Sequence, residues 1–158
     1  MHPLMTILDS QKRGIPAGIY SCCSAMLPAD FYAYVLRLCA QYGVPESQVI
    51  LGGDHLGPLT WTDLPEAEAM CRAEALVSLF VEAGFTKIHL DTSMRLASDS
   101  RSERLADDVI AARGARLCKA AEAAYAKRLA QHPESPAPVY VIGSEVPIPG
   151  GAQEAEED

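Results

Sequence analysis

Several features that would assign the chain to a familiar class are absent from its sequence. No apolar run approaches the roughly 18 residues that a membrane-spanning helix requires. Basic residues are scattered, and a formal net charge of −8 with a pI near 4.9 disfavours non-specific nucleic-acid binding. Polar and charged residues interrupt Met1 to Gly14, where a secretory signal needs an unbroken apolar stretch. We therefore expect a cytoplasmic protein with no membrane and no nucleic-acid partner.

Patterned cysteines and nucleotide-binding motifs are also missing. The five cysteines are odd in number and widely spaced, which excludes a zinc ribbon and a disulfide framework. No Gly-x-x-x-x-Gly-Lys loop or other nucleotide fingerprint is present, which argues against a kinase. Apolar residues form 49% of the 158, enough for a hydrophobic core. The length predicts one domain over residues 1–158, with a mobile acidic tail at 151–158.

What the chain does contain is three short apolar runs that each end in ionisable residues. They lie at Val49–His55, Ile88–Ser93 and Val139–Glu145. Each run is rich in β-branched residues and follows a helix-like stretch, which is typical of buried parallel strands. Because parallel strands deliver their carboxyl ends to one edge of a sheet, the sequence predicts one shared site there.

The remaining segments complete an alternation of strands and helices. We expect a short leading helix, indicated by Leu4, Met5, Ile7 and Leu8 and ended at Gly14, which is followed by a first strand over residues 15–24. Further strands are predicted at residues 49–51, 87–90 and 139–142. Helices are predicted to begin near Pro28, Pro65 and Ser102, because proline is favoured in a first helical turn and serine is a frequent N-cap. The predicted fold is α/β with about four parallel strands.

Asp54 and His55 follow a glycine pair at the end of the second run. The glycines permit a sharp turn and a close approach to a ligand. A carboxylate beside an imidazole can act as a general acid or base next to a metal ligand, although such a pair is also often structural. Glu145 ends the last run and precedes a glycine pair at Gly150–Gly151, whose amides could cradle a phosphate.

His89, Asp91 and Ser93 alternate along the third strand and its end. Side chains two residues apart on a strand point to the same side. That side is either the barrel interior or the site, and His89 by itself is interpreted first as a buried histidine whose ring is satisfied by a hydrogen bond. Asp91 and Ser93 lie at the strand end and are the better candidates for a site.

Long motifs around these residues resemble the GatZ/KbaZ family of D-tagatose-1,6-bisphosphate aldolase subunits, once labelled tagatose-6-phosphate kinases. The motifs occur in the family's order and span nearly the whole chain. They are Ser21-Cys-Cys-Ser-Ala25, Leu27-Pro-Ala-Asp-Phe31, Ile50-Leu-Gly-Gly-Asp-His-Leu-Gly-Pro58, Lys87-Ile-His-Leu-Asp-Thr-Ser-Met94 and Tyr140-Val-Ile-Gly-Ser-Glu-Val-Pro-Ile-Pro-Gly-Gly151.

The resemblance implies a (β/α)₈ barrel related to the zinc-dependent class II aldolases. It implies Asp54 as catalytic acid or base, His55 as a zinc ligand and Glu145 as a second catalytic residue. It also implies substrate contacts from Asp91 and Ser93, with Gly150 and Gly151 in a glycine loop that binds substrate. The implied partners are a phosphorylated ketohexose and a separate catalytic aldolase subunit, and a homo-oligomer is an alternative assembly.

The chain also departs from the family's pattern. A β/α unit that the family has after Ala25 is missing, and family members continue well past the Pro-Gly-Gly loop. Eight strands with their helices take about 250 residues, so the expected fold is a partial barrel with an incomplete metal site.

Three hypotheses follow from this departure. The first is a subunit that supports a catalytic aldolase in tagatose, galactitol or amino-sugar catabolism and is not catalytic alone. The second is a metal-dependent ketose-bisphosphate aldolase or ketohexose 4-epimerase in its own right. The third is an inactive truncated remnant.

Overall fold

Four parallel strands form a single sheet in the computed structural model, which describes residues 4–9, 27–100, 102 and 104–143. The strands are β1 (Leu4–Asp9), β2 (Val49–Leu56), β3 (Lys87–Leu90) and β4 (Val139–Ile142). Their order across the sheet, β1-β2-β3-β4, follows their order along the chain. Sequential parallel strands joined by helices are the building pattern of a (β/α)₈ barrel. The predicted α/β class and partial barrel are confirmed.

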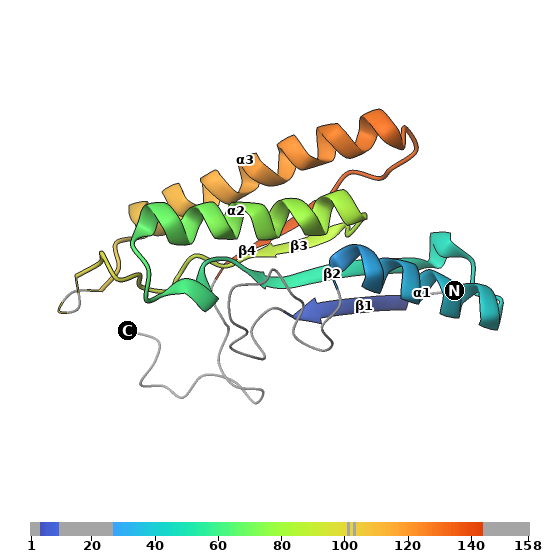
Figure 1. Cartoon of the computed structure of the whole chain (residues 1–158), viewed down its shortest axis with the longest axis horizontal. Coiled ribbons are helices and arrows are strands. Elements are labelled where there is room, and N and C mark those ends of the chain that lie inside the picture. The colour runs from blue at the N-terminus through green and yellow to red at the C-terminus, as the bar shows by residue number, and fades with distance from the viewer. Residues whose placement is uncertain (1–3, 10–26, 101, 103, 144–158) are drawn as a thin grey trace.

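Three α-helices connect and cover the strands. They are α1 (Pro28–Tyr42), α2 (Glu66–Ala83) and α3 (Asp107–Gln131), and two short 3₁₀ turns flank β2 at Glu46–Gln48 and Leu59–Trp61. Helices α2 and α3 lie side by side on one face of the sheet (Figure 1), with α2 packed against β2 and α3 against β3. Helix α1 packs beside α2. None of the helices that the structure describes is long and apolar enough to cross a membrane.

Proline and glycine set the helix boundaries as the sequence predicts. Pro28 occupies the first turn of α1, and Pro65 immediately precedes α2. Gly43 and Gly84 end these helices with φ of 68° and 104°, in the left-handed region that glycine adopts without a steric penalty. Helix α3 begins at Asp107 instead of Ser102. Its first turn carries Asp107 and Asp108, which interact favourably with the positive end of the helix dipole.

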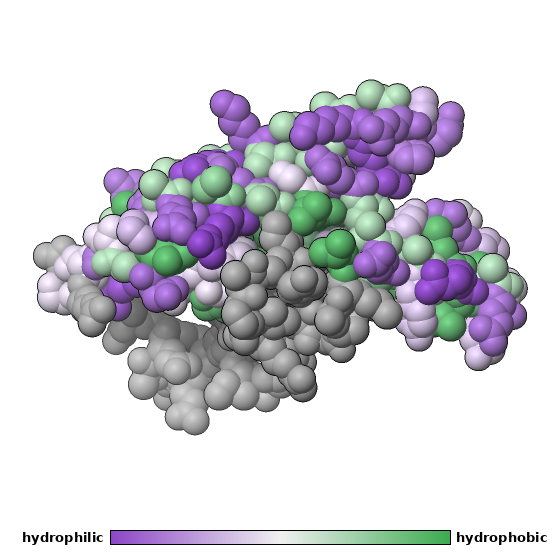
Figure 2. All heavy atoms as spheres, viewed as in Figure 1, coloured by the Kyte–Doolittle hydropathy of each residue, from purple (hydrophilic) through white to green (hydrophobic). Residues whose placement is uncertain are grey.

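The core lies between the helices and the sheet, and α2 supplies most of it. Its buried residues are Ala69, Met70, Ala73, Leu76, Val77, Phe80 and Val81. The Phe80 ring packs edge to face against Phe85, with centroids 4.8 Å apart. Hydrophilic residues gather over the outer surfaces of α3 and α1 (Figure 2). Each helix buries an apolar stripe against the core and exposes its opposite, polar face to solvent, which accounts for this layered arrangement.

Two predicted elements are wrong. The segment over residues 4–8 is strand β1, which pairs in parallel with β2 from Leu4 opposite Val49 to Asp9 opposite Asp54. A single isolated turn of helix forms few hydrogen bonds, whereas a strand on a sheet satisfies its backbone along its length. The second strand does not end at Leu51 but continues through the glycine pair to Leu56. The strand predicted over residues 15–24 lies outside the described residues.

The alternation of side chains along β3 gives the sheet two different faces. Ile88 and Leu90 are buried in the core beneath the helices. Lys87 and His89 therefore point to the opposite face. In the parallel register with β4, Lys87 and His89 stand opposite Val139 and Val141, which are 66% and 41% exposed. The ionisable residues of β3 thus lie on the face away from α2 and α3.

Candidate functional site at the carboxyl ends of the strands

A β-bulge near the end of β2 builds the candidate site. Gly53 stands opposite Ile88 and Leu56 stands opposite Leu90, so β2 holds one residue more than β3 across this interval. His55 has a φ of 50° within the bulge and is the one non-glycine residue of the described chain with a positive φ. A bulge breaks the alternation of side chains. Consecutive residues Asp54 and His55 can therefore both approach His89 on the neighbouring strand.

The Asp54 carboxylate is the hub of the cluster. Its Oδ1 accepts a hydrogen bond from the Lys87 ammonium, with Nζ at 2.9 Å. The same oxygen lies 2.7 Å from Nδ1 of His89, and Oδ2 lies 3.6 Å from Nδ1 of His55. All of these side chains are largely buried, with 22% of Asp54 and of Lys87 exposed. Cationic or hydrogen-bonding side chains from both β2 and β3 therefore converge on this one carboxylate.

The imidazole of His89 joins three strands. Its Nδ1 faces Asp54 on β2, and its Nε2 lies 3.2 Å from the carbonyl oxygen of Gly143, directly after β4. The rings of His89 and His55 lie 4.7 Å apart between centroids and are tilted by 54°. The prediction that His89 is buried and hydrogen-bonded is confirmed, and the partner is the predicted catalytic carboxylate.

The charge state of Asp54 follows from these contacts. Burial disfavours the carboxylate and by itself raises the pKa of Asp54. The hydrogen bonds from Lys87 and His89, with the positive charge of Lys87, outweigh burial and hold the pKa of Asp54 below its ordinary value. Asp54 is therefore an anion at neutral pH. In this arrangement it can hold a cation or accept a proton, but it has no proton to give.

The donor atoms of the cluster suit a transition metal. Asp54, His55 and His89 each offer one ligand atom, and these atoms lie within 4.8 Å of one another. Two imidazole nitrogens and one carboxylate oxygen form a donor set that zinc accepts. The Lys87 ammonium at Oδ1 of Asp54 competes with a cation at that oxygen. The residues thus fit a metal in type and proximity, with His55 as predicted and His89 in addition.

Asp91 and Ser93 lie next to this cluster at the end of β3. Asp91 is 3% exposed, and its Oδ1 accepts hydrogen bonds from the backbone nitrogen of Ser93 at 3.0 Å and from its hydroxyl at 2.7 Å. Both residues line a cavity of about 580 Å³ between the ends of β3 and β4 and helix α3. The predicted substrate residues therefore form one compact turn beside a cavity.

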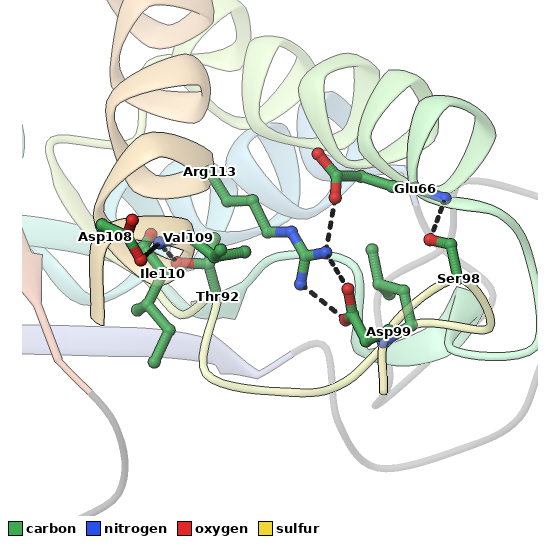
Figure 3. A network of polar contacts seen from close by, with 9 residues as sticks. Glu66, Thr92, Ser98, Asp99, Asp108, Val109, Ile110 and Arg113 are labelled. Carbon is green, nitrogen blue, oxygen red and sulfur yellow. Dashed lines mark hydrogen bonds and ion pairs between the residues drawn. The ribbon is translucent and has the colours of Figure 1, made fainter. Parts of the chain in front are cut away.

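A buried arginine fastens the loop that follows this turn. Arg113 on α3 is 2% exposed and donates two hydrogen bonds to Asp99, from Nη1 to Oδ2 at 2.9 Å and from Nη2 to Oδ1 at 2.7 Å. Its Nη2 also donates to Oε2 of Glu66 at the start of α2, at 2.6 Å (Figure 3). The hydrogen bonds from Arg113 hold the pKa of Asp99 below its ordinary value, although burial by itself raises that pKa. Arg113 thereby ties two helices to the loop that begins at Asp91.

The structure brings together only part of the predicted site. Asp54, His55, Asp91 and Ser93 lie at the carboxyl ends of adjacent strands, as expected. Glu145, Gly150 and Gly151 lie outside the described residues, as does the predicted acidic tail. Sequence reasoning gave His89 no functional role and did not weigh Lys87. The sequence did carry a signal for both residues: Lys87 and His89 are two residues apart on β3, so alternation puts their side chains on the same face of the sheet.

The chain resembles known proteins over most of its length. Residues 24–158 match the family described as D-tagatose-1,6-bisphosphate aldolase subunit GatZ/KbaZ-like. Among solved structures, it is similar to a probable tagatose 6 phosphate kinase from Sinorhizobium meliloti 1021, with 37% sequence identity and a TM-score of 0.73. That match covers 91% of this chain and 33% of the other, so the chain spans about a third of that protein.

Proposed function

Because this chain belongs to the GatZ/KbaZ-like family, we propose that it acts as a subunit of a class II D-tagatose-1,6-bisphosphate aldolase. Its role is to support the activity and stability of a separate catalytic subunit. The family match over residues 24–158 carries this proposal. The reaction served is retro-aldol cleavage of tagatose 1,6-bisphosphate to glyceraldehyde 3-phosphate and dihydroxyacetone phosphate, in the cytoplasmic catabolism of tagatose, galactitol or amino sugars.

The contacts of Asp54 favour a supporting role over independent catalysis. Its carboxylate is already engaged by Lys87 and His89, at 2.9 and 2.7 Å. A general acid needs a proton near the operating pH, and a pKa held below the ordinary carboxyl value works against that. Asp54 can orient the two histidines and neutralise positive charge. Only if the chain is an enzyme in its own right do we assign Asp54 and Glu145 to proton transfer, and Asp91, Ser93, Gly150 and Gly151 to the substrate.

The test is reconstitution of the full chain with a catalytic class II aldolase subunit. Cleavage of tagatose 1,6-bisphosphate is measured for the chain alone, for the catalytic subunit alone and for the mixture. We expect no turnover by the chain alone. In the mixture, we expect a higher rate and a longer half-life at elevated temperature than for the catalytic subunit alone. A mixture that behaves as the catalytic subunit does alone would reject the supporting role.

A second candidate is a metal-dependent ketose-bisphosphate aldolase or ketohexose 4-epimerase. The cluster of Asp54, His55 and His89 favours it, because a bound divalent ion would supply the Lewis acid that stabilises an enediolate in either reaction. Aldol cleavage or epimerisation by the purified chain, lost in His55→Ala together with stoichiometric zinc, would establish this candidate. A chain that neither turns over substrate nor stimulates a catalytic subunit would be an inactive remnant.

A further inference from the structure

We propose that His89 is a direct ligand of a divalent transition metal, completing a three-donor site with Asp54 and His55 at the bulge of β2. This inference deepens the proposed function, from which it takes His55 as a metal ligand. It adds a donor from a different strand, so that β2 and β3 share the ion. Metal binding then depends on the pairing of β2 with β3 and not only on the consecutive Asp54 and His55.

The separations between the donor atoms carry the argument. Two ligands of one tetrahedral ion, with metal bonds of about 2.0–2.2 Å, lie about 3.3–3.6 Å apart. The ligand atoms of Asp54, His55 and His89 lie within 4.8 Å of one another before any ion binds. The most distant pair must therefore approach by at most about 1.5 Å to complete the set. Rotation about the side-chain bonds can supply this without moving a strand.

The backbone holds the donors in place. Asp54 and His55 are consecutive, and the bulge with the positive φ of His55 directs both toward β3. The β3 strand is internal in the sheet, paired with β2 on one side and β4 on the other. The side chains of His55 and His89 are 15% and 11% exposed. They are thus partly shielded from water but open enough for an ion to enter.

The donor chemistry selects the class of ion. Two imidazoles with one carboxylate favour zinc, cobalt, nickel or copper over magnesium and calcium, which prefer oxygen ligands. Three protein ligands also leave a coordination position open for water or substrate. The Lys87 ammonium opposes the ion, because it contacts Oδ1 of Asp54 at 2.9 Å. Removing that charge while keeping a side chain of similar length should strengthen metal binding.

The experiment measures metal binding by the full chain, freed of metal with a chelator. Zinc affinity is determined by competition with a chromophoric chelator, and X-ray absorption spectroscopy counts the imidazoles around zinc. Cobalt binding is followed by its visible absorption. The variants are His89→Ala, His89→Gln and Lys87→Met. The matched control is His132→Ala, since His132 is exposed at the end of α3. Circular dichroism establishes that each variant is folded.

We expect one zinc per chain with two imidazoles in the wild type and in His132→Ala, and one imidazole in both His89 variants. Affinity should fall at least about tenfold in His89→Ala and His89→Gln, and rise about tenfold in Lys87→Met. His89→Gln is informative because its amide can still hydrogen-bond Asp54. If His89→Gln binds zinc with wild-type affinity and with two imidazoles around the ion, direct ligation by His89 is overturned.

The inference and the proposed function fail separately. Zinc that binds with one imidazole in the wild type and is lost only in His55→Ala overturns the role of His89 and leaves the subunit proposal intact. Absence of stoichiometric zinc overturns the metal site altogether, whatever the reconstitution shows. Two imidazoles in the wild type, with no effect on a catalytic subunit, would support the metal site while rejecting the supporting role.

Discussion

The carboxylate of Asp54 and the imidazole of His89 lie 2.7 Å apart, although 35 residues separate them in the sequence. Asp54 comes from the bulge of β2 and His89 from the interior of β3. The contact links the residue predicted to be catalytic with one predicted to be structural. The two side chains form one unit, since a change in either alters the environment of the other.

The first prediction concerns the strength of this contact. A double-mutant cycle with Asp54→Ala and His89→Ala should give a coupling free energy of about 1.5–3 kcal/mol, the range for a hydrogen bond to a charged group. The free energies of unfolding are measured by urea denaturation of the full chain. The control cycle pairs Asp54→Ala with Arg72→Ala, because Arg72 bonds to Glu68 and shares no partner with Asp54. Coupling as small as in the control would contradict the prediction.

The second prediction concerns the buried ion pair of Arg113 and Asp99. Asp99→Asn should lower the free energy of unfolding by about 3 kcal/mol at neutral pH, because it removes one partner of a buried pair. The pKa of Asp99 is lowered from 3.8 in the folded chain. Its stabilisation is therefore present above pH 3.8 and is lost as the pH falls through the lower folded value.

Unfolding curves of the wild type and of Asp99→Asn, recorded from pH 7 to pH 2, test this directly. The two free energies should converge as the pH decreases. Asp107→Asn is the control, because the Asp107–Arg104 pair is exposed; it should lower the free energy of unfolding by no more than about 1 kcal/mol at neutral pH, through the lost interaction with the helix dipole. A gap between wild type and Asp99→Asn that is constant across this range would contradict the assigned pKa direction.

The third prediction concerns the close approach of Gly57 to the turn of Asp91. A Cβ at Gly57 would overlap the carbonyl oxygen of Asp91, and backbone atoms cannot rotate away. Gly57→Ala should therefore cost about 3 kcal/mol of stability. Gly114→Ala is the contrast, since its Cβ would lie 3.6 Å from Thr92 Oγ1, an ordinary contact. In the interior of α3 it should stabilise by about 0.5–1 kcal/mol. Thermal unfolding of both variants provides the measurement.

The fourth prediction concerns the backbone of His55. Its φ of 50° is unfavourable for any residue with a Cβ. His55→Gly should therefore be more stable than His55→Ala by about 1 kcal/mol, although both lack the imidazole. Comparison of these two variants by denaturation isolates the backbone contribution. Equal stabilities would show that the bulge relaxes to an ordinary conformation when the imidazole is removed.

Much of the fold could be predicted from local signals. The predicted strands over residues 87–90 and 139–142 are β3 and β4, and Gly43 and Gly84 end the helices as expected. Proline and glycine mark the ends of the helices clearly, and the apolar residues within each element recur at a single spacing. The segment over residues 4–8 was mispredicted because five residues cannot distinguish helical from strand spacing, and pairing with β2 decided its conformation.

The candidate site was predicted less completely. The positions of Asp54, His55, Asp91 and Ser93 at strand ends follow from the places where the apolar runs stop. The roles of His89 and Lys87 do not, because their partner Asp54 lies on another strand. The network of Arg113, Asp99 and Glu66 has no local signature either, since its members are far apart in the sequence and meet only on packing.

The sequence by itself determined the alternation of strands and helices, the family motifs and the delivery of ionisable residues to strand ends. These depend on local periodicity and on residue identity. Only the tertiary structure decided that β2 runs on through its glycine pair and bulges at His55, with three donors around one point. The physical reason is that a bulge exists only relative to the neighbouring strand. The register of β2 against β3 sets which side chains meet, and no single segment encodes that register.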